Sequence, residues 1–296
     1  VDGFWIDRHP VTNRQFARFV AATGYVTVAE QPLDPALYPG APAENLAAGS
    51  MVFTPTSGPV DLGNAANWWA WTPGADWRHP RGPGSTLDGL AEHPVVQVAL
   101  ADAEAYCAWS GAVLPTEVEW EHAARGGLDG ATFAWGNEER PDGQLMANTW
   151  QGHFPWYNTE EDRFAYTSPV GSFPGNGYGL LDVAGNVWEW TADWYAAPRT
   201  EASRACCTPE YARGAERERS VTPQHVQFRV PRKVVKGGSH LCAPSYCYRY
   251  RPAARQPQDI NTGMSHLGFR CVVRSSERFN IHRPQALQSD QTVRAS

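Results

Sequence analysis

Two cysteines in the segment Cys242-Ala-Pro-Ser-Tyr-Cys247 are the side chains best suited to do chemistry in this sequence. Pro244-Ser245 between them can turn the chain, so that the two sulfurs meet. The following Arg249-Tyr-Arg251 would favour thiolate over thiol. Two thiolates suit a soft ion of low coordination number such as Cu(I). Structural zinc takes four ligands, and no nearby Cys/His pair completes that set. Spacing alone equally allows a structural disulfide or two buried thiols.

Oxygen-bearing side chains gather in two turn-rich segments. The first combines Asn148-Thr149 with Asp162-Arg-Phe164, and the second runs from Asp182 to Glu189. Ca²⁺ is usually held by side-chain oxygens and backbone carbonyls of loops, although neither segment fits the EF-hand pattern. Ordinary Asx turns would explain the same composition. Calcium binding is therefore one of two interpretations that the residues themselves allow.

The composition predicts a compact, loop-rich chain. Its 296 residues include 27 Gly, 24 Pro and 13 Trp, and 42% are hydrophobic, which excludes a disordered chain. So many turn residues argue against a helical bundle. The net charge of −6 gives no basic surface for nucleic acid. No apolar run reaches the roughly 18 residues of a membrane span. The first residues lack the basic start and apolar core of a signal peptide.

Three helices must position the chemistry, together with short strands. Capping boxes at Thr12-Asn-Arg-Gln15 and Thr116-Glu-Val-Glu119 predict two helices, which Gly24 and Gly126 end. A third helix is expected from about Ala101 to Trp109, because apolar residues recur there and a glycine follows. We expect one domain, because nothing in the sequence marks a linker.

The remainder of the chain is predicted to be strands and loops. Residues 27–95 resemble a long loop rich in Pro, Gly and Trp, which is unusual unless it is functional or a packed insertion. Alternation of side chains predicts a strand within 233–251, and 267–273 is expected to be a buried final strand. Beyond the domain at 1–274, residues 275–296 are expected to be a polar tail on the surface.

Motifs along most of the chain resemble the formylglycine-generating enzyme, or sulfatase-modifying factor, family. They are Asp7–Asn13, His93–Val98, Leu114–Glu121, Asn176–Leu180, Gly185–Trp190, Lys236–Ser239 and Leu267–Cys271. The discriminating segment runs from Gly237 to Arg251, because superfamily members without this chemistry lack its cysteine pair. The resemblance covers about residues 4 to 274.

The resemblance implies an α+β fold of the C-type-lectin-like kind and an aerobic oxidase. The enzyme would convert a cysteine within Cys-x-Pro-x-Arg of an extended or unfolded sulfatase polypeptide to Cα-formylglycine, with O₂ as co-substrate. Cu(I) would bind Cys242 and Cys247, and Ser239, Tyr246 and Trp188 would complete the active site. The alternative is a non-catalytic binding module on the same scaffold, in which the cysteine pair is a structural disulfide.

The resemblance also implies two structural calcium ions. The ligands of the first would be Asn148, Thr149, Asp162 and Phe164. Those of the second would be Asp182, Gly185, Val187 and Glu189. Thr149, Phe164, Gly185 and Val187 would contribute backbone carbonyls.

The other cysteines give an expectation for the cellular compartment of the protein. Ala124 and Pro252 replace both partners of one disulfide of the animal enzymes, whereas Cys107 and Cys271 keep the partners of the other. Cys206-Cys207 has no family counterpart and is assigned no role. Because disulfides are rarer in the cytosol, we expect a bacterial, cytoplasmic monomer without a nucleic-acid or membrane partner.

Overall fold

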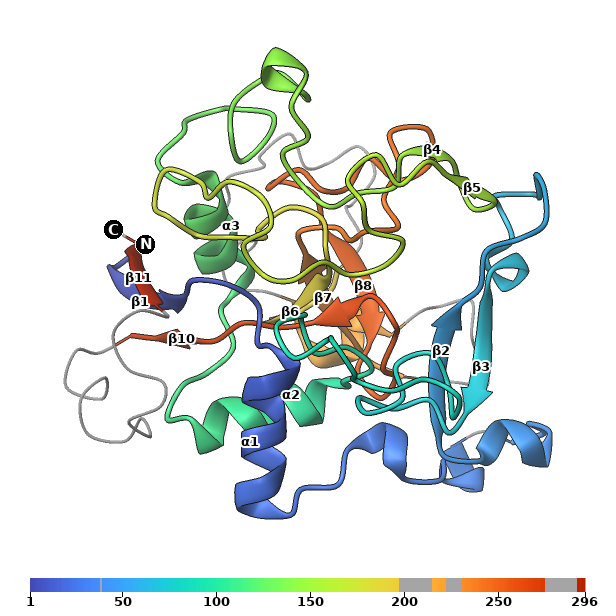
Figure 1. Ribbon diagram of the computed structural model, residues 1–296. Coiled ribbons are helices and arrows are strands. Elements are labelled where there is room, and N and C mark those ends of the chain that lie inside the picture. The colour runs from blue at the N-terminus through green and yellow to red at the C-terminus, as the bar shows by residue number, and fades with distance from the viewer. Residues whose placement is uncertain (38, 197–214, 222–229, 275–291, 296) are drawn as a thin grey trace.

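The computed structural model describes residues 1–37, 39–196, 215–221, 230–274 and 292–295 (Figure 1). Within them the α-helices are α1 (Asn13–Thr23), α2 (Leu100–Trp109) and α3 (Glu117–Arg125). The strands are β1 (Phe4–Asp7), β2 (Gly49–Phe53), β3 (Trp69–Pro73), β4 (Gly152–His153), β5 (Tyr157–Asn158), β6 (Trp188–Trp194), β7 (Arg232–Lys236), β8 (Gln256–Asp259), β9 (Leu267–Gly268), β10 (Val272–Val273) and β11 (Thr292–Ala295). Short 3₁₀ helices lie at Val28–Glu30, Pro35–Leu37, Ala43–Leu46, Ala65–Asn67, Pro141–Gly143 and Arg217–Ser220.

The three predicted helices are confirmed, and local signals set their ends. The Thr12 and Thr116 side chains cap α1 and α3 by accepting hydrogen bonds from backbone N–H groups three residues on. Gly24 and Gly126 end these helices in the left-handed conformation, which costs glycine little. The Asp102 carboxylate caps α2 by accepting from the Ala99 N–H at 2.8 Å.

A central sheet in the order β8-β7-β6-β9 positions the candidate site (Figure 1). Strand β6 runs antiparallel to β7 and parallel to β9. The start of β6, the end of β7 and the start of β9 therefore meet at one end of the sheet. Trp188 opens β6, Ser239 follows β7 after two glycines, and His266 directly precedes β9. Three segments far apart in the sequence thus deliver side chains to one place.

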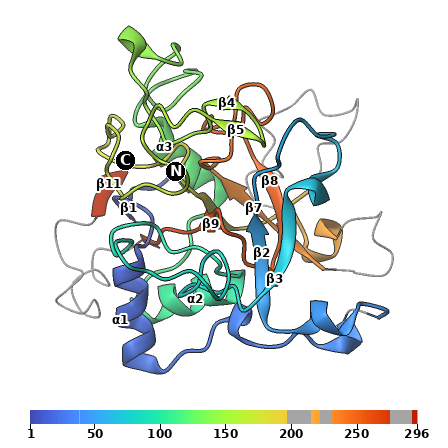
Figure 2. The same ribbon diagram turned by 45° about the vertical axis from the view of Figure 1, so that its right-hand side comes forward.

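The expectation of one long loop at 27–95 is wrong in part. Strands β2 and β3 form an antiparallel hairpin with Met51 opposite Trp71 and Phe53 opposite Trp69. The hairpin lies beside the central sheet (Figures 1 and 2), and Met51 bridges to Met264 just before β9. The alternation in Trp69-Ala-Trp71 was too short to reveal a strand among so many turn residues, because tertiary pairing decides such segments.

The expectation of a purely polar tail is also corrected. Residues 275–291 lie outside the described part of the chain, but β11 pairs with β1 in antiparallel register, with Ile6 opposite Val293. The three-stranded sheet β10-β1-β11 brings the two ends of the chain side by side (Figure 1). The reason is that β1 carries backbone hydrogen-bonding groups on both edges, and β11 pairs with the edge that β10 leaves open.

Two strand predictions were longer than the strands that form. Strand β7 ends at Lys236, and residues 245–251 are not a strand despite their alternation. The chain turns there, because Tyr246 and Cys247 both donate backbone N–H bonds to Ala243 O, at 3.0 and 2.8 Å. The buried final strand splits into β9, which pairs with β6, and β10, which pairs with β1.

The largest hydrophobic core lies between the helices and the central sheet. Phe16, Tyr106 and Phe269 pack in it as mutually perpendicular or stacked rings. Cys107 and Cys271 are both buried in this core, and their pairing stays a prediction. Cys206 and Cys207 lie outside the described residues. Among the residues that are described, no helix has the length and apolarity needed to cross a membrane.

Candidate active site

The turn after β7 brings the two predicted cysteines together. Cys242 Sγ and Cys247 Sγ lie 3.0 Å apart as free thiols. Only 1% of Cys242 and 7% of Cys247 is exposed. The Cys242 N–H donates to Ser239 O at 2.9 Å, which ties the first cysteine to the end of the sheet. The dithiol is therefore a buried pair held by backbone hydrogen bonds.

The two thiols differ in acidity. The hydrogen bond with Cys242 and the charge of Arg249 lower the pKa of Cys247, although burial opposes them. Burial raises the pKa of Cys242 well above that of an ordinary thiol, and the neighbouring Cys247 adds to the effect. Cys247 therefore loses its proton first. Arg251 does not help as expected, because it lies over the Tyr248 ring at 5.0 Å and donates to Tyr248 O.

A cavity of about 60 Å³ opens over the dithiol. Besides the cysteines it is lined by Trp68, Trp69, Phe154, Trp188, Ser239, Leu241, Tyr246, Arg249, Gln256 and His266. Trp188 and Ser239 are buried, whereas Tyr246 is 38% exposed and lies toward the outside. All five side chains predicted for the active site, Cys242, Cys247, Ser239, Tyr246 and Trp188, thus line one cavity.

Aromatic rings form the walls of this cavity. The Tyr246 ring stacks on Phe154, with centroids 4.5 Å apart, and meets Trp68 edge-on at 5.5 Å. The aromatic residues of 67–77 could line the cavity or fill the core. Both occur, because Trp68 and Trp69 line the cavity while Trp77 belongs to the main core.

His266 is a site residue that the sequence did not indicate. Its Nδ1 lies 3.1 Å from Ser239 Oγ, and its ring meets Trp69 edge-on at 4.6 Å. The nine histidines are scattered and form no metal-ligand spacing, so nothing marked this one. Its significance comes from Ser239, which lies 27 residues earlier in the chain.

The fold brings two members of the first expected calcium set, Thr149 and Asp162, to one side chain. Asn148 Oδ1 is buried and has no hydrogen-bond partner. Thr149 O and Asp162 Oδ2 both accept from the side-chain nitrogen of Gln151, so these two oxygens converge on one point. Burial raises the pKa of Asp162. A buried amide oxygen without a partner, and carbonyl and carboxylate oxygens that meet at one donor, are the ligand types that a hard cation takes.

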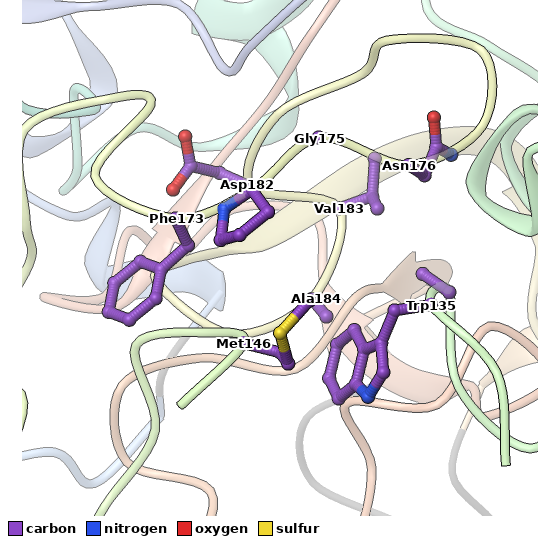
Figure 3. A pocket seen from close by; sticks show the side chains of 10 residues that line it. Trp135, Met146, Phe173, Gly175, Asn176, Asp182, Val183 and Ala184 are labelled. Atoms are coloured by element: carbon purple, nitrogen blue, oxygen red, sulfur yellow. The ribbon is translucent and has the colours of Figure 1, made fainter. Parts of the chain in front are cut away.

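The second expected set lies next to the first. Gly185 bridges to Asn148, and its φ of 70° suits glycine. A side chain at Gly185 would collide with Asn148 O, which a Cβ would approach to 2.1 Å. Asp182 lies beside a cavity of about 10 Å³ (Figure 3), and its carboxylate accepts from the Gly171 N–H at 2.7 Å. Val187 is buried directly before β6.

Glu189 has a different partner from the one that the resemblance implied. Its Oε2 accepts from Arg270 Nε and from Trp120 Nε1, both at 2.6 Å. Its Oε1 accepts from Arg270 Nη2 at 2.7 Å. Both Glu189 and Arg270 are fully buried. The guanidinium thus neutralises both carboxylate oxygens of Glu189, and the role of this residue as a calcium ligand stays a prediction.

Known proteins resemble this chain along nearly its whole length. Residues 1–275 match the Sulfatase-modifying factor enzyme 1-like domain. The formylglycine-generating enzyme of Mycobacterium tuberculosis is 58% identical over 275 residues, which are 92% of this chain and 88% of that protein. The chain belongs to the formylglycine-generating enzyme family. The enzyme of Thermomonospora curvata is 45% identical over 274 residues, 91% of this chain and 81% of its own.

A solved structure supports the fold. The structure of PvdO from Pseudomonas aeruginosa matches with a TM-score of 0.56 over 91% of this chain and 79% of its own, at 20% identity. At that identity the likeness concerns the fold alone. Together with family membership, it confirms the predicted α+β fold with little regular secondary structure. Membership also confirms the predicted enzyme class, an oxidase.

Proposed function

We propose that this chain is a copper-dependent oxidase that converts the cysteine of a Cys-x-Pro-x-Arg segment in sulfatases to Cα-formylglycine, using O₂. The observation that carries the proposal is the buried dithiol at the base of an aromatic cavity, with 3.0 Å between Cys242 Sγ and Cys247 Sγ. Membership of the formylglycine-generating enzyme family supports the substrate class. We further propose that the chain acts as a cytoplasmic monomer.

The donor set fits Cu(I). Two sulfurs are soft ligands, and the acidified Cys247 supplies one thiolate readily. When bound between Cys242 and Cys247, copper would supply the activation of O₂ that side chains cannot perform. The surrounding protein excludes water, because the sulfurs lie almost entirely below the surface.

The other cavity residues bind and orient the substrate. We place the extended peptide along the exposed Tyr246 ring, which stacks on the buried Phe154 ring, while the buried Trp188 lines the same cavity. The substrate cysteine reaches inward toward the dithiol. Ser239 and Tyr246 line the cavity, and each carries a hydroxyl that can hydrogen-bond the substrate sulfur. A cavity of about 60 Å³ admits a single side chain, and we propose that it is presented by an extended or unfolded segment.

The alternative function is a non-catalytic binding module with a structural disulfide. Its requirement is a bond between Cys242 and Cys247, whereas these residues are free thiols in the structure. The two proposals differ in a direct measurement. The oxidase binds one Cu(I) per chain and exposes both thiols to a labelling reagent after unfolding without reductant, whereas the binding module does neither.

Calcium is proposed as a structural ion at the first set, with Asn148 Oδ1, Thr149 O, Asp162 and Phe164 O as ligands. The orphaned Asn148 oxygen and the buried Asp162 carboxylate support this assignment. For the second set the proposal is confined to Asp182, Gly185 and Val187. Ca²⁺ has no accessible second oxidation state and takes no part in the redox step.

A peptide assay tests the proposed function. A synthetic Cys-x-Pro-x-Arg peptide is incubated with the enzyme, Cu(I) and O₂, and its mass is followed. We expect the loss of mass that accompanies replacement of CH₂–SH by CHO, and capture of the aldehyde by a hydroxylamine. Cys242→Ser and Cys247→Ser should abolish turnover while the protein stays folded, because a hydroxyl binds Cu(I) poorly. Near wild-type turnover of either variant would refute the copper dithiolate.

A further inference from the structure

His266 and Ser239 form a hydrogen-bonded pair beside the dithiol. Ser239 is fully buried and His266 is 8% exposed, and both line the cavity over Cys242 and Cys247. His266 Nδ1 lies 3.1 Å from Ser239 Oγ. A buried serine next to a buried histidine is a costly arrangement unless both are hydrogen-bonded, and here each is a partner of the other.

The hydrogen-bonding capacity of Ser239 limits what it can do. A hydroxyl has one proton to donate and two lone pairs that accept. The backbone N–H of Leu241 donates to Ser239 Oγ at 3.3 Å and uses one lone pair. If the proton points to His266, one lone pair is left for the cavity. If the proton points into the cavity instead, the Ser239 hydroxyl and the S–H of an arriving thiol would both be donors, and no hydrogen bond would form from the thiol to the hydroxyl.

The surroundings hold His266 neutral and fixed in place. Burial lowers the pKa of His266 well below that of an ordinary histidine, and the neighbouring His240 adds to this. A neutral ring has one accepting nitrogen. The His266 carbonyl accepts from the Trp188 N–H at 2.8 Å, and the ring packs edge-on against Trp69. The accepting nitrogen is thus held at a constant distance from the serine.

We infer that His266 is a positioning residue that acts through Ser239. Its Nδ1 accepts the Ser239 O–H, so that the remaining lone pair of Ser239 Oγ faces the cavity and accepts the S–H of the substrate cysteine. The inference rests on the proposed function, because it concerns the same substrate thiol. It assigns a role to a side chain that lies outside the motifs quoted above.

A double-mutant cycle tests this inference with the peptide assay. His266→Leu removes both ring nitrogens at similar volume, and Ser239→Ala removes the hydroxyl. We expect each to lower kcat/KM about 10- to 100-fold, as loss of a supporting hydrogen bond often does. The double variant should be no slower than the slower single variant, because both changes break one device. His79→Leu serves as control, since it removes a histidine that bonds Ser85 O instead.

A conservative variant separates positioning from packing. Asparagine places its amide near the location of Nδ1, whereas glutamine reaches farther, so His266→Asn should recover most of the activity and His266→Gln should not. This comparison also carries the test if His266→Leu melts below the assay temperature. Cu(I) stoichiometry, measured by competition with a chromophoric chelator, should be unchanged in every variant.

The outcomes distinguish the two proposals. A wild-type enzyme that leaves the peptide unchanged would refute the proposed function. With an active wild type, three results would overturn the role of His266 alone. They are full activity of His266→Leu, equal activity of His266→Asn and His266→Gln, and losses that multiply in the double variant with Ser239→Ala.

Discussion

Replacement of Arg270 by methionine should lower the free energy of unfolding by about 3–5 kcal/mol, the usual cost of breaking a buried ion pair from one side. The change strands the fully buried Glu189 carboxylate, whose two oxygens lie 2.6 and 2.7 Å from the guanidinium. It also deprives four backbone carbonyls of a donor, those of Asp7, Arg8, Leu181 and Asp182. The Glu189 carboxylate is fully buried, so water cannot replace its lost partner.

The companion variants decide between an ion pair and a calcium site. Glu189→Leu should cost a similar amount, because it strands the guanidinium instead. The double variant should cost clearly less than the sum of the two, because no buried charge remains unpaired. Each free energy comes from urea denaturation, and a constant m-value checks that the folded and unfolded states are otherwise unchanged.

The same urea denaturation is carried out once in Ca²⁺ and once in EGTA. If Arg270 neutralises Glu189, the cost of Glu189→Leu is the same in Ca²⁺ and in EGTA. If Glu189 ligates calcium, EGTA removes most of that cost, because the wild type then loses the ion as well. A cost that vanishes in EGTA, or single costs that add to within about 0.5 kcal/mol, would refute the ion-pair argument.

Three further predictions concern calcium, the titration of Asp102 and the pairing of Cys107 with Cys271. EGTA should lower the melting temperature of the wild type, because a bound ion stabilises the folded state by mass action. Asp162→Ala should lower the melting temperature without EGTA. A wild-type melting curve that exhaustive chelation leaves unchanged contradicts this. Burial raises the pKa of Asp102 to about 6, so stability from its neutral form is present below about pH 4 and lost as pH rises through 6. Asp102→Asn should flatten that decline in urea titrations, and an unchanged slope argues otherwise. Alkylation after unfolding under non-reducing conditions, followed by peptide mapping, reports whether Cys107 and Cys271 pair. Labels on both of these thiols would show that they do not.

The helices were predictable because their signals are local. The capping partners of α1 lie three residues apart at Thr12 and Gln15, so neighbouring side chains alone determine where the helix starts. The β2–β3 hairpin depends instead on pairing between residues 49–53 and 69–73, across a connection rich in turns. The tail strand β11 pairs with β1 at the opposite end of the chain. Periodicity in a window of sequence does not contain such pairings.

The candidate site likewise contains residues that the local sequence predicts and residues that only the fold brings in. The cysteine pair was visible in the sequence, because only four residues separate the two cysteines and a proline among them suggests a turn. His266 was not visible, because an isolated histidine gains a role only from the serine that the sheet places beside it. The resemblance did not indicate the partner of Glu189, since the two quoted motifs that hold Glu189 and Arg270 lie 81 residues apart and only the fold pairs these side chains.

The cavity has a rigid base and an aromatic rim, and this arrangement explains how a chain with so little regular structure can position a reacting sulfur. Trp188, Ser239 and His266 come from three adjoining strand ends, so the hydrogen bonds of the central sheet fix their mutual distances. Tyr246 and Phe154 come from turns and meet through ring stacking, which tolerates small shifts. Sulfur chemistry requires fixed geometry at the base, whereas recognition of varied peptide residues around the cysteine benefits from a rim that can adjust.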